Sequence, residues 1–307
     1  MSEPVFQREQ DGIDDAEWQR LLEEASAGGR RFFTANQLYL AYARNRVQVT
    51  RYIARRGLWG LAMIVLGLAG WVYALKVDWG VTLVVGIAVT LSGVAMVGTG
   101  VVTRRDPAAR EPVTRWLAKW TAQRGSERLI AEPSLSHAGL ELSPRTVECL
   151  LILERDALVD LFVKNSAHDE LCALVVAESG YPHALASEAR RMLAERPDLP
   201  VICLHDATPA GVGLVGRLLK SEHYALAARP LVDAGLFPAE VTWLAELAPA
   251  IPAGHTSRVP LDSLSLEALV IGIRGIKRGE LSLQPAIQHA AERALEHAVP
   301  APAAVEA

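Results

Sequence analysis

The chain has 307 residues, half of which are apolar, and its formal net charge is −4. This length accommodates one ordinary domain with additional segments, the high apolar fraction indicates membrane segments, and the small negative charge excludes a generic binder of polyanions. The three cysteines show no paired spacing, which argues against a disulfide framework and a cysteine-based zinc site.

Residues 1–29 carry eight acidic and two basic side chains and lack the basic start and early apolar run of a cleaved signal peptide. The run Asp14-Asp15-Ala16-Glu17 suits the cap of a short helix through Ala25. The acidic composition favours a partly disordered arm over the rest of this segment. Residues 30–56 reverse the charge, with seven arginines and no acid. We expect a basic helix that leads into a membrane, although basic residues interleaved with aromatic ones also occur in nucleic-acid-binding segments.

Two stretches, 57–75 and 80–102, contain no charged residue. At about 1.5 Å per residue, each is long enough to cross a hydrocarbon core of about 30 Å. The short link between them predicts a transmembrane hairpin over residues 57–102. Small residues spaced four apart, such as Gly70 and Ala74, suit close helix pairing, so a homo-oligomer or a partner protein is an open alternative to a monomer.

The segment after the hairpin, residues 103–132, is rich in basic side chains, with seven between residues 103 and 128 against three acidic ones. The positive-inside rule therefore predicts a two-pass protein of the inner (cytoplasmic) membrane with both termini in the cytoplasm. Within this segment one helical face gathers Val113, Trp116, Leu117 and Trp120. That face suits either an anionic lipid leaflet or docking on the soluble domain, and the sequence leaves both open.

Residues 133–283 alternate continuous apolar runs with amphipathic helical patterns, which predicts an α/β domain with a parallel sheet. The runs at 148–154, 171–177 and 201–204 are the predicted strands. In such sheets chemistry gathers at the carboxyl ends of the strands, where Glu154 and Asp206 stand. Residues 284–307 are expected to form a C-terminal helix followed by a disordered tail rich in proline and alanine.

Three segments of this domain also carry a family resemblance: Ile152–Phe162, Ala173–Pro182 and Leu199–Gly211. Taken in order, they resemble the Toprim domain, in the version found in the A subunit of topoisomerase VI and its meiotic double-strand-break relatives. That family has a strand ending in a metal-binding Glu, a Gly-Tyr-Pro loop and a strand ending in Asp-x-Asp-Pro-x-Gly. The resemblance implies a Toprim-like, Rossmann-like fold, with Glu154 and Asp206 as magnesium ligands and catalytic carboxylates.

Two departures from the family pattern separate this chain from an active enzyme. Thr208 stands at the position of the second metal-binding Asp, and nothing upstream resembles the winged-helix domain that carries the nucleophilic Tyr. A site made of Glu154, Asp206 and Thr208 has one negative charge fewer, so it predicts at most weak Mg²⁺ binding. Thr208 followed by proline also suits a helix N-cap with Pro at the first helical position.

Other polar residues near these strand ends are candidates for the same cleft. They are Glu178, Ser179, Tyr181 and His183 around the Gly-Tyr-Pro loop, and His205 beside Asp206. The glycine pattern over residues 211–216 lies within the predicted helix instead of opening it, so we assign it to packing and expect no nucleotide cofactor.

Three functional hypotheses follow, and the sequence favours the first. It is a membrane-anchored, catalytically degenerate Toprim-like domain that acts by binding or scaffolding. The second is a Mg²⁺-dependent phosphotransfer or nuclease-type enzyme that uses Glu154 and Asp206 on nucleic acid or nucleotide. The third is a membrane protein with an unrelated Rossmann-like domain. Residues 133–283 hold 13 basic and 19 acidic residues, a net charge of −6, which disfavours a nucleic-acid partner.

Overall fold

The structure is a computed structural model of the chain. It describes residues 4–43, 45, 110–135, 147–221, 223–226, 229, 231–239, 241, 259–280, 282–285 and 287–288, and from the intervening region residues 62, 64–66, 68–69, 89–90 and 92. The chain divides into two compact units, one comprising Met1–Ala41 with Arg110–Ala307 and the other comprising Tyr42–Ala109.

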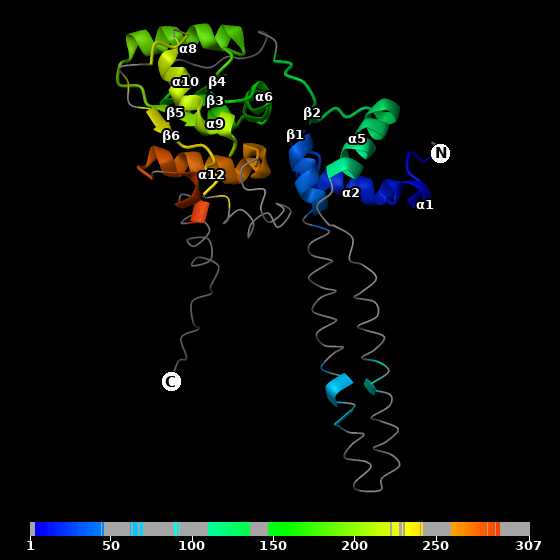
Figure 1. The fold of residues 1–307 in the computed structure, drawn as a ribbon. Coiled ribbons are helices and arrows are strands. Elements are labelled where there is room, and N and C mark those ends of the chain that lie inside the picture. Colours follow the sequence, from blue (N-terminus) through cyan, green and yellow to red (C-terminus); the bar gives the residue numbers. More distant parts are fainter. Residues whose placement is uncertain are drawn as a thin grey trace, which may run out of the picture. The chain divides into compact units, whose positions relative to one another are not determined.

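A sheet of four parallel strands forms the centre of the larger unit (Figure 1). The strands lie in the spatial order β4-β3-β5-β6, and their bounds are β3 Cys149–Leu153, β4 Ala173–Ala177, β5 Val201–Leu204 and β6 Leu231–Asp233. β3 is central, with Leu151 in register with Val175 of β4 and Ile202 of β5. Every residue of β3, β4 and β5 is buried, as their continuous apolar runs predict. The α/β class with a parallel sheet is confirmed.

Helices cover both faces of this sheet (Figure 1). Leu151 and Leu153 pack with α6 (Asp156–Lys164) and α12 (Leu266–Lys277), and the alternate residues of β3 pack with α8 (His183–Glu195) and α10 (Leu214–Lys220). The chain passes from β3 to β4 through α6 and the short α7 (Ala167–Glu170), and from β4 to β5 through α8 on the opposite face. The sheet is therefore doubly wound, and its topological switch point lies between β3 and β5.

The first residues of the chain form helices that pack on a later helix. The first helices are α1 (Arg8–Asp11) and α2 (Asp15–Ala25), and the later helix is α5 (Arg110–Arg124). As predicted, Asp14 caps α2 by accepting a hydrogen bond of 2.8 Å from the Glu17 amide, and α2 ends at Ala25. Trp18 is fully buried, with ring centroids 6.3 Å from Trp116 and 6.4 Å from Trp120.

These contacts change two expectations about the N-terminal and juxtamembrane segments. The acidic segment was expected to be partly disordered, but its buried Trp18 and Phe6 supply the apolar area that its composition otherwise lacks. The apolar face of α5, with Trp116 and Trp120, is buried against this N-terminal segment. The sequence left a lipid leaflet and the α/β domain as the two candidate surfaces for this face. It packs instead on the N-terminal segment.

A two-stranded parallel sheet joins segments far apart in the sequence: β1 (Phe33–Thr34) pairs with β2 (Leu129–Ile130). β1 is fixed to the α/β domain by Asn165, at the end of α6. The Asn165 carboxamide accepts a hydrogen bond of 2.8 Å from the Phe32 amide and donates one of 3.0 Å to the Phe32 carbonyl. A helical segment over residues 35–43 follows β1 directly. β1 is thus the connection between this helix and the α/β domain.

The predicted membrane spans 57–75 and 80–102 fall mostly outside the described residues. Those described within them are helical, and Val65, Leu66 and Leu68 are large apolar side chains with 50% or more of their surface exposed. In the part of the chain that the structure describes, no helix is both long and apolar enough to cross a membrane. Most of the predicted C-terminal tail, 284–307, also lies outside the described residues.

Candidate functional site

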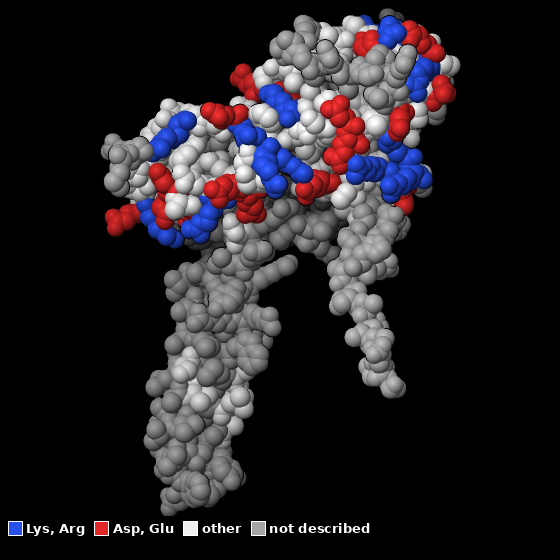
Figure 2. Space-filling view, turned by 180° about the vertical axis from the view of Figure 1, so that it is seen from behind, with Lys and Arg blue, Asp and Glu red and all other residues white. Residues whose placement is uncertain are grey.

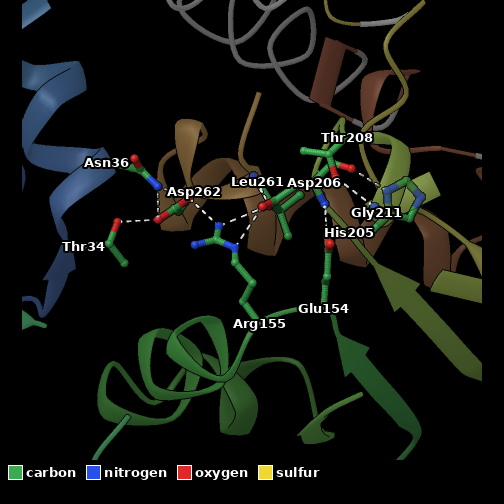
Figure 3. Close-up of polar contacts among 10 residues, drawn as sticks. All are labelled: Thr34, Asn36, Glu154, Arg155, His205, Asp206, Thr208, Gly211, Leu261 and Asp262. Atoms are coloured by element: carbon green, nitrogen blue, oxygen red, sulfur yellow. Dashed lines mark hydrogen bonds and ion pairs between the residues drawn. The ribbon is translucent and has the colours of Figure 1, made fainter. Parts of the chain in front are cut away.

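The two predicted carboxylates lie side by side at the switch point of the sheet (Figure 3). Glu154 directly follows β3, and Asp206 follows β5 after one intervening residue. Because β3 and β5 are adjacent and parallel, their carboxyl ends meet at the same edge. The Asp206 amide donates a hydrogen bond of 2.9 Å to Glu154 Oε2. The two predicted strand-end carboxylates thus lie on adjacent strands, and we call Glu154, Arg155, Asp206 and Asp262 the strand-end site.

An arginine that the sequence analysis did not select occupies the centre of this site. Arg155 Nη2 donates a hydrogen bond of 3.1 Å to Asp206 Oδ1, and Nε lies 2.9 Å from Asp206 Oδ2, where the angle makes the contact an ion pair rather than a hydrogen bond. The Leu261 amide donates a further hydrogen bond of 2.6 Å to Asp206 Oδ1. Both carboxylate oxygens of Asp206 are therefore engaged by protein groups.

A third carboxylate, Asp262 in the 3-10 helix η3 (Leu261–Ser263), completes the arrangement. Asp262 is fully buried, and its Oδ1 accepts a hydrogen bond of 2.6 Å from Arg155 Nη2. Thr34 Oγ1 donates to its Oδ2 at 2.6 Å, and Asn36 Nδ2 lies 3.0 and 3.1 Å from its two oxygens. Figure 3 shows Thr34 and Asn36 reaching Asp262 from the side opposite Asp206.

The charges of this site compensate one another through Arg155. Burial lowers the pKa of the Arg155 guanidinium, but Asp262 and Asp206 more than reverse this effect, and the net pKa is raised. Burial raises the pKa of Asp206, and Arg155 and the Leu261 amide oppose this only in part. Arg155 is therefore a permanent cation that two buried carboxylates share. Arg155 supplies the positive charge beside these carboxylates that a metal ion supplies in other clusters of carboxylates.

Thr208 is a helix N-cap, as its position before a proline allows. It is the N-cap of α9 (Pro209–Val212), and its Oγ1 accepts a hydrogen bond of 2.8 Å from the Gly211 amide. Pro209 occupies the first helical position. A Cβ on Gly211 would lie 2.1 Å from the Asp206 carbonyl oxygen and 2.9 Å from Glu154 Oε2. Glycine is required here because the start of α9 lies directly against the strand-end site.

The atoms of this arrangement do not fit a Mg²⁺ ion. Both oxygens of Asp206, Oε2 of Glu154 and Oγ1 of Thr208 already accept hydrogen bonds or an ion pair from protein groups. Mg²⁺ requires near-octahedral oxygen ligands and would have Arg155 as an immediate cationic neighbour. Within the described ranges, no group of three or more His, Cys, Asp or Glu side chains is arranged to hold a metal ion.

The residues of the Gly-Tyr-Pro loop do not join the strand-end site. Glu178 pairs with Arg217 of α10, with Nε–Oε1 at 2.6 Å and Nη2–Oε2 at 2.8 Å. Two others turn to carboxylates of α6: Ser179 Oγ donates to Asp156 at 2.6 Å, and the Tyr181 hydroxyl donates to Asp160 at 2.7 Å. Burial and the bond to Asp160 raise the pKa of Tyr181. The remaining candidate, His183, is exposed at the start of α8.

His205 is a buried residue with two hydrogen-bond acceptors and is directed away from the strand-end site. Its Nδ1 lies 2.8 Å from the Asp206 carbonyl oxygen, and its Nε2 lies 2.9 Å from Asp233 Oδ1. Each ring nitrogen faces an acceptor, and the doubly protonated form of the ring can donate a hydrogen bond to both. Burial lowers the pKa of His205, but the bonds to Asp233 and to the Asp206 carbonyl outweigh it, and the net pKa is raised.

Sequence reasoning found the two strand-end carboxylates and missed both Arg155, which pairs with Asp206, and Asp262, which shares that arginine. Arg155 had a usable signal, since a cation that directly follows a strand-end carboxylate lies beside the next strand end in a parallel sheet. Asp262 had no such signal, because its partners Thr34 and Asn36 are more than two hundred residues away in the sequence.

Comparison with models of protein families, with curated proteins and with solved structures finds no match for this chain. The resemblance to the Toprim domain therefore rests on the three sequence segments alone. The fold and the strand-end geometry described above are what any functional proposal has to explain.

Proposed function

We propose that this protein is a membrane-anchored binding or scaffolding protein whose Toprim-like domain holds a structural arginine where relatives of that type hold a metal. The observation that carries the proposal is the position of the Arg155 guanidinium between Asp206 and Asp262. A cation supplied by the chain itself stabilises these buried carboxylates without an exchangeable ion. A site whose Asp206 and Asp262 share an internal cation in this way supports a binding role over phosphoryl transfer.

The membrane anchor in this proposal rests on the sequence and on a few described side chains. Residues 57–75 and 80–102 carry no charge, and basic residues flank the pair. Val65, Leu66 and Leu68 are helical and largely exposed, which is unfavourable in water and favourable in lipid. These features support a two-pass anchor with both termini in the cytoplasm, and reporter fusions at each terminus test that topology.

The distribution of charge supports a partner other than nucleic acid. On the face shown in Figure 2, the described acidic and basic side chains are interspersed rather than gathered by sign. Several of the arginines are paired with carboxylates, including Arg191 with Glu195 and Arg274 with Glu170. A duplex-binding surface requires a basic stripe that faces the phosphates. Together with the net charge of −6 over residues 133–283, this pattern favours a protein partner or a second copy of the chain.

The test is a metal titration combined with a nuclease assay on the full chain in detergent micelles. We expect no measurable Mg²⁺ or Mn²⁺ binding at millimolar concentrations and no cleavage of supercoiled or linear DNA. The double substitution Arg155→Gln with Thr208→Asp removes the internal cation and adds a carboxylate, so it should produce divalent-cation binding. The same protein with Thr208→Asp alone is the matched control, because its Asp206 and Asp262 still share the Arg155 guanidinium.

Metal-dependent cleavage by the wild type that disappears in Asp206→Ala would overturn the proposal and establish the phosphotransfer alternative. Mn²⁺ binding by the wild type that requires Asp206 would also contradict it. The double variant is judged by calorimetric titration and not by activity, so a gain of binding without catalysis still supports the structural role of Arg155.

A further inference from the structure

Asp262 accepts hydrogen bonds from two segments of the chain that lie far apart in the sequence. Thr34 and Asn36 come from the segment at the end of β1, and Arg155 comes from the junction of β3 and α6. Asp262 is fully buried, so each donor that it loses leaves part of a carboxylate without compensation. The buried carboxylate therefore links the position of the first segment to that of the second.

The chain around Asp262 also covers the strand-end site. The Ala207 amide donates a hydrogen bond of 2.8 Å to the Val259 carbonyl, and the Leu261 amide donates one of 2.6 Å to Asp206. Residues 259–262 thus cap the end of β5 and hold Asp206 in place. Because Asp262 belongs to this covering segment, loss of its bonds to Thr34 and Asn36 weakens the cover as well.

Thr34 has a second role that connects this cover to the rest of the chain. It forms a reciprocal capping box with Gln37: the Gln37 amide donates to Thr34 Oγ1 at 3.3 Å, and Gln37 Oε1 accepts from the Thr34 amide at 3.2 Å. Thr34 is therefore the cap of the helical segment 35–43. This segment continues in sequence toward the predicted span 57–75.

We propose that Asp262 is a conformational latch that couples the helix over residues 35–43 to the strand-end site. In the latched state described here, Thr34 and Asn36 hold Asp262, and residues 259–262 cover Asp206 and Arg155. Withdrawal of residues 34–36 removes these donors, loosens the cover and exposes the Arg155–Asp206 pair to a partner. The inference rests on the proposed function for its purpose, since it makes the membrane segment the regulator of a cytoplasmic binding site.

The latch is tested by hydrogen exchange of the full chain in nanodiscs, read at the amides of Asp206, Ala207 and Leu261. In the variant Thr34→Val with Asn36→Ala, Asp262 loses the donors from both residues. We expect exchange at these amides to be about tenfold faster, which corresponds to about 1.4 kcal/mol. By reciprocity, Asp262→Asn should accelerate exchange in residues 35–43.

Gln37→Ala is the matched control, because it removes half of the capping box and leaves all donors to Asp262 in place. It should accelerate exchange in residues 35–43 and leave the Leu261 amide within about twofold of the wild type. The latch would be overturned if the Leu261 amide exchanged at the same rate in the double variant as in the wild type. It would also be overturned if the double variant and Gln37→Ala accelerated exchange at the Leu261 amide equally.

Exchange in α8 reports global unfolding in every variant. If the double variant unfolds globally, Asn36→Ala alone decides the question by the same comparison. None of these readouts depends on metal binding or nuclease activity. A failed latch therefore leaves the proposed function standing, and a failed proposed function leaves the exchange result intact.

Discussion

Two arginine–carboxylate pairs lie at the carboxyl ends of the strands in the same sheet and differ in their surroundings. Arg217 and Glu178, at the end of β4, form a bidentate pair whose side chains are 43% and 25% exposed. Arg155 and Asp206, at the end of β5, are 32% and 10% exposed, and Asp262 on the other side of Arg155 is completely buried. The pair at β5 is embedded in the fold, and the pair at β4 lies on its surface.

The difference teaches that the same kind of ion pair has different consequences at two strand ends of one sheet. An exposed pair exchanges hydration for a contact of similar free energy, so its net contribution is small. In a buried pair, each charge depends on the other for compensation, so removal of one partner leaves the other unpaired in the interior. The following substitutions break or sharpen this comparison, in order of decreasing expected effect.

Arg155→Gln should have the largest effect. It leaves Asp206 and Asp262 without their shared cation, and we expect the free energy of unfolding to fall by about 3 kcal/mol, the lower end for a buried pair because the guanidinium is partly exposed. Urea-dependent pulse proteolysis of the full chain in detergent micelles measures the change. A loss no greater than that of Arg217→Gln would show that the two pairs are equivalent.

Gly211→Ala tests how tightly the start of α9 packs on the strand-end site. The added Cβ would lie 2.1 Å from the Asp206 carbonyl oxygen, and we expect a cost of about 2 kcal/mol from forced displacement. Gly216→Ala, in the following helix, is the matched control, because its Cβ would meet no atom within 4 Å. It should raise the free energy of unfolding by about 0.5 kcal/mol. Similar effects of the two substitutions would contradict the packing argument.

Asp233→Asn tests the buried imidazolium of His205. The pKa of His205 is higher in the folded protein than its value of about 6.5 in the unfolded chain, so protonation of His205 stabilises the fold. This stabilisation is complete at a pH below the pKa of the unfolded chain and is lost as the pH rises through the pKa of the folded protein. We expect the variant to lose about 1.5 kcal/mol at pH 6, and the difference from the wild type to narrow toward pH 9. Unfolding free energies measured across this range check the sign.

His183→Gln serves as the control for the pH series, because His183 is exposed at the start of α8. Its pH profile should follow that of the wild type. The opposite result would be a free energy of unfolding that rises between pH 6 and pH 9 in the wild type but not in Asp233→Asn. It would show that His205 is neutral in the folded protein.

Arg217→Gln should have the smallest effect of the series. Hydrogen bonding to Glu178 raises the pKa of Arg217, but both side chains are substantially exposed and water replaces the contact. We expect a loss of about 0.5 kcal/mol, decreasing further in high salt. A loss above 2 kcal/mol, measured under the conditions used for Arg155→Gln, would contradict the distinction between the two strand ends.

The α/β domain was largely predictable from its sequence because local pattern and tertiary environment agree there. The run at 201–204 is β5, and the run at 148–154 contains β3. Both elements are continuous or amphipathic apolar patterns whose period matches the buried surface. The cap at Thr208 was readable for the same reason, since a threonine before a proline specifies a helix start without distant partners.

The N-terminal segment and the partners of the strand-end site were not predictable in this way. The order of the acidic segment depends on Trp18 meeting Trp116 and Trp120, which are about a hundred residues away in the sequence. Asp262 depends on Thr34 and on Arg155, in two other segments. Such contacts follow from the tertiary structure and leave no periodic trace in the local sequence.

The short parallel pairing of Phe33–Thr34 with Leu129–Ile130 has a topological consequence. It holds together the chain on either side of residues 35–128, so this stretch, which includes residues 42–109 of the smaller unit, is an insertion between fixed ends. The entropy of closing such an insertion grows only with the logarithm of its length, by about 0.6 kcal/mol per doubling. The part of the chain between these ends is therefore free to lengthen, shorten or be exchanged over evolutionary time while the rest of the fold is retained.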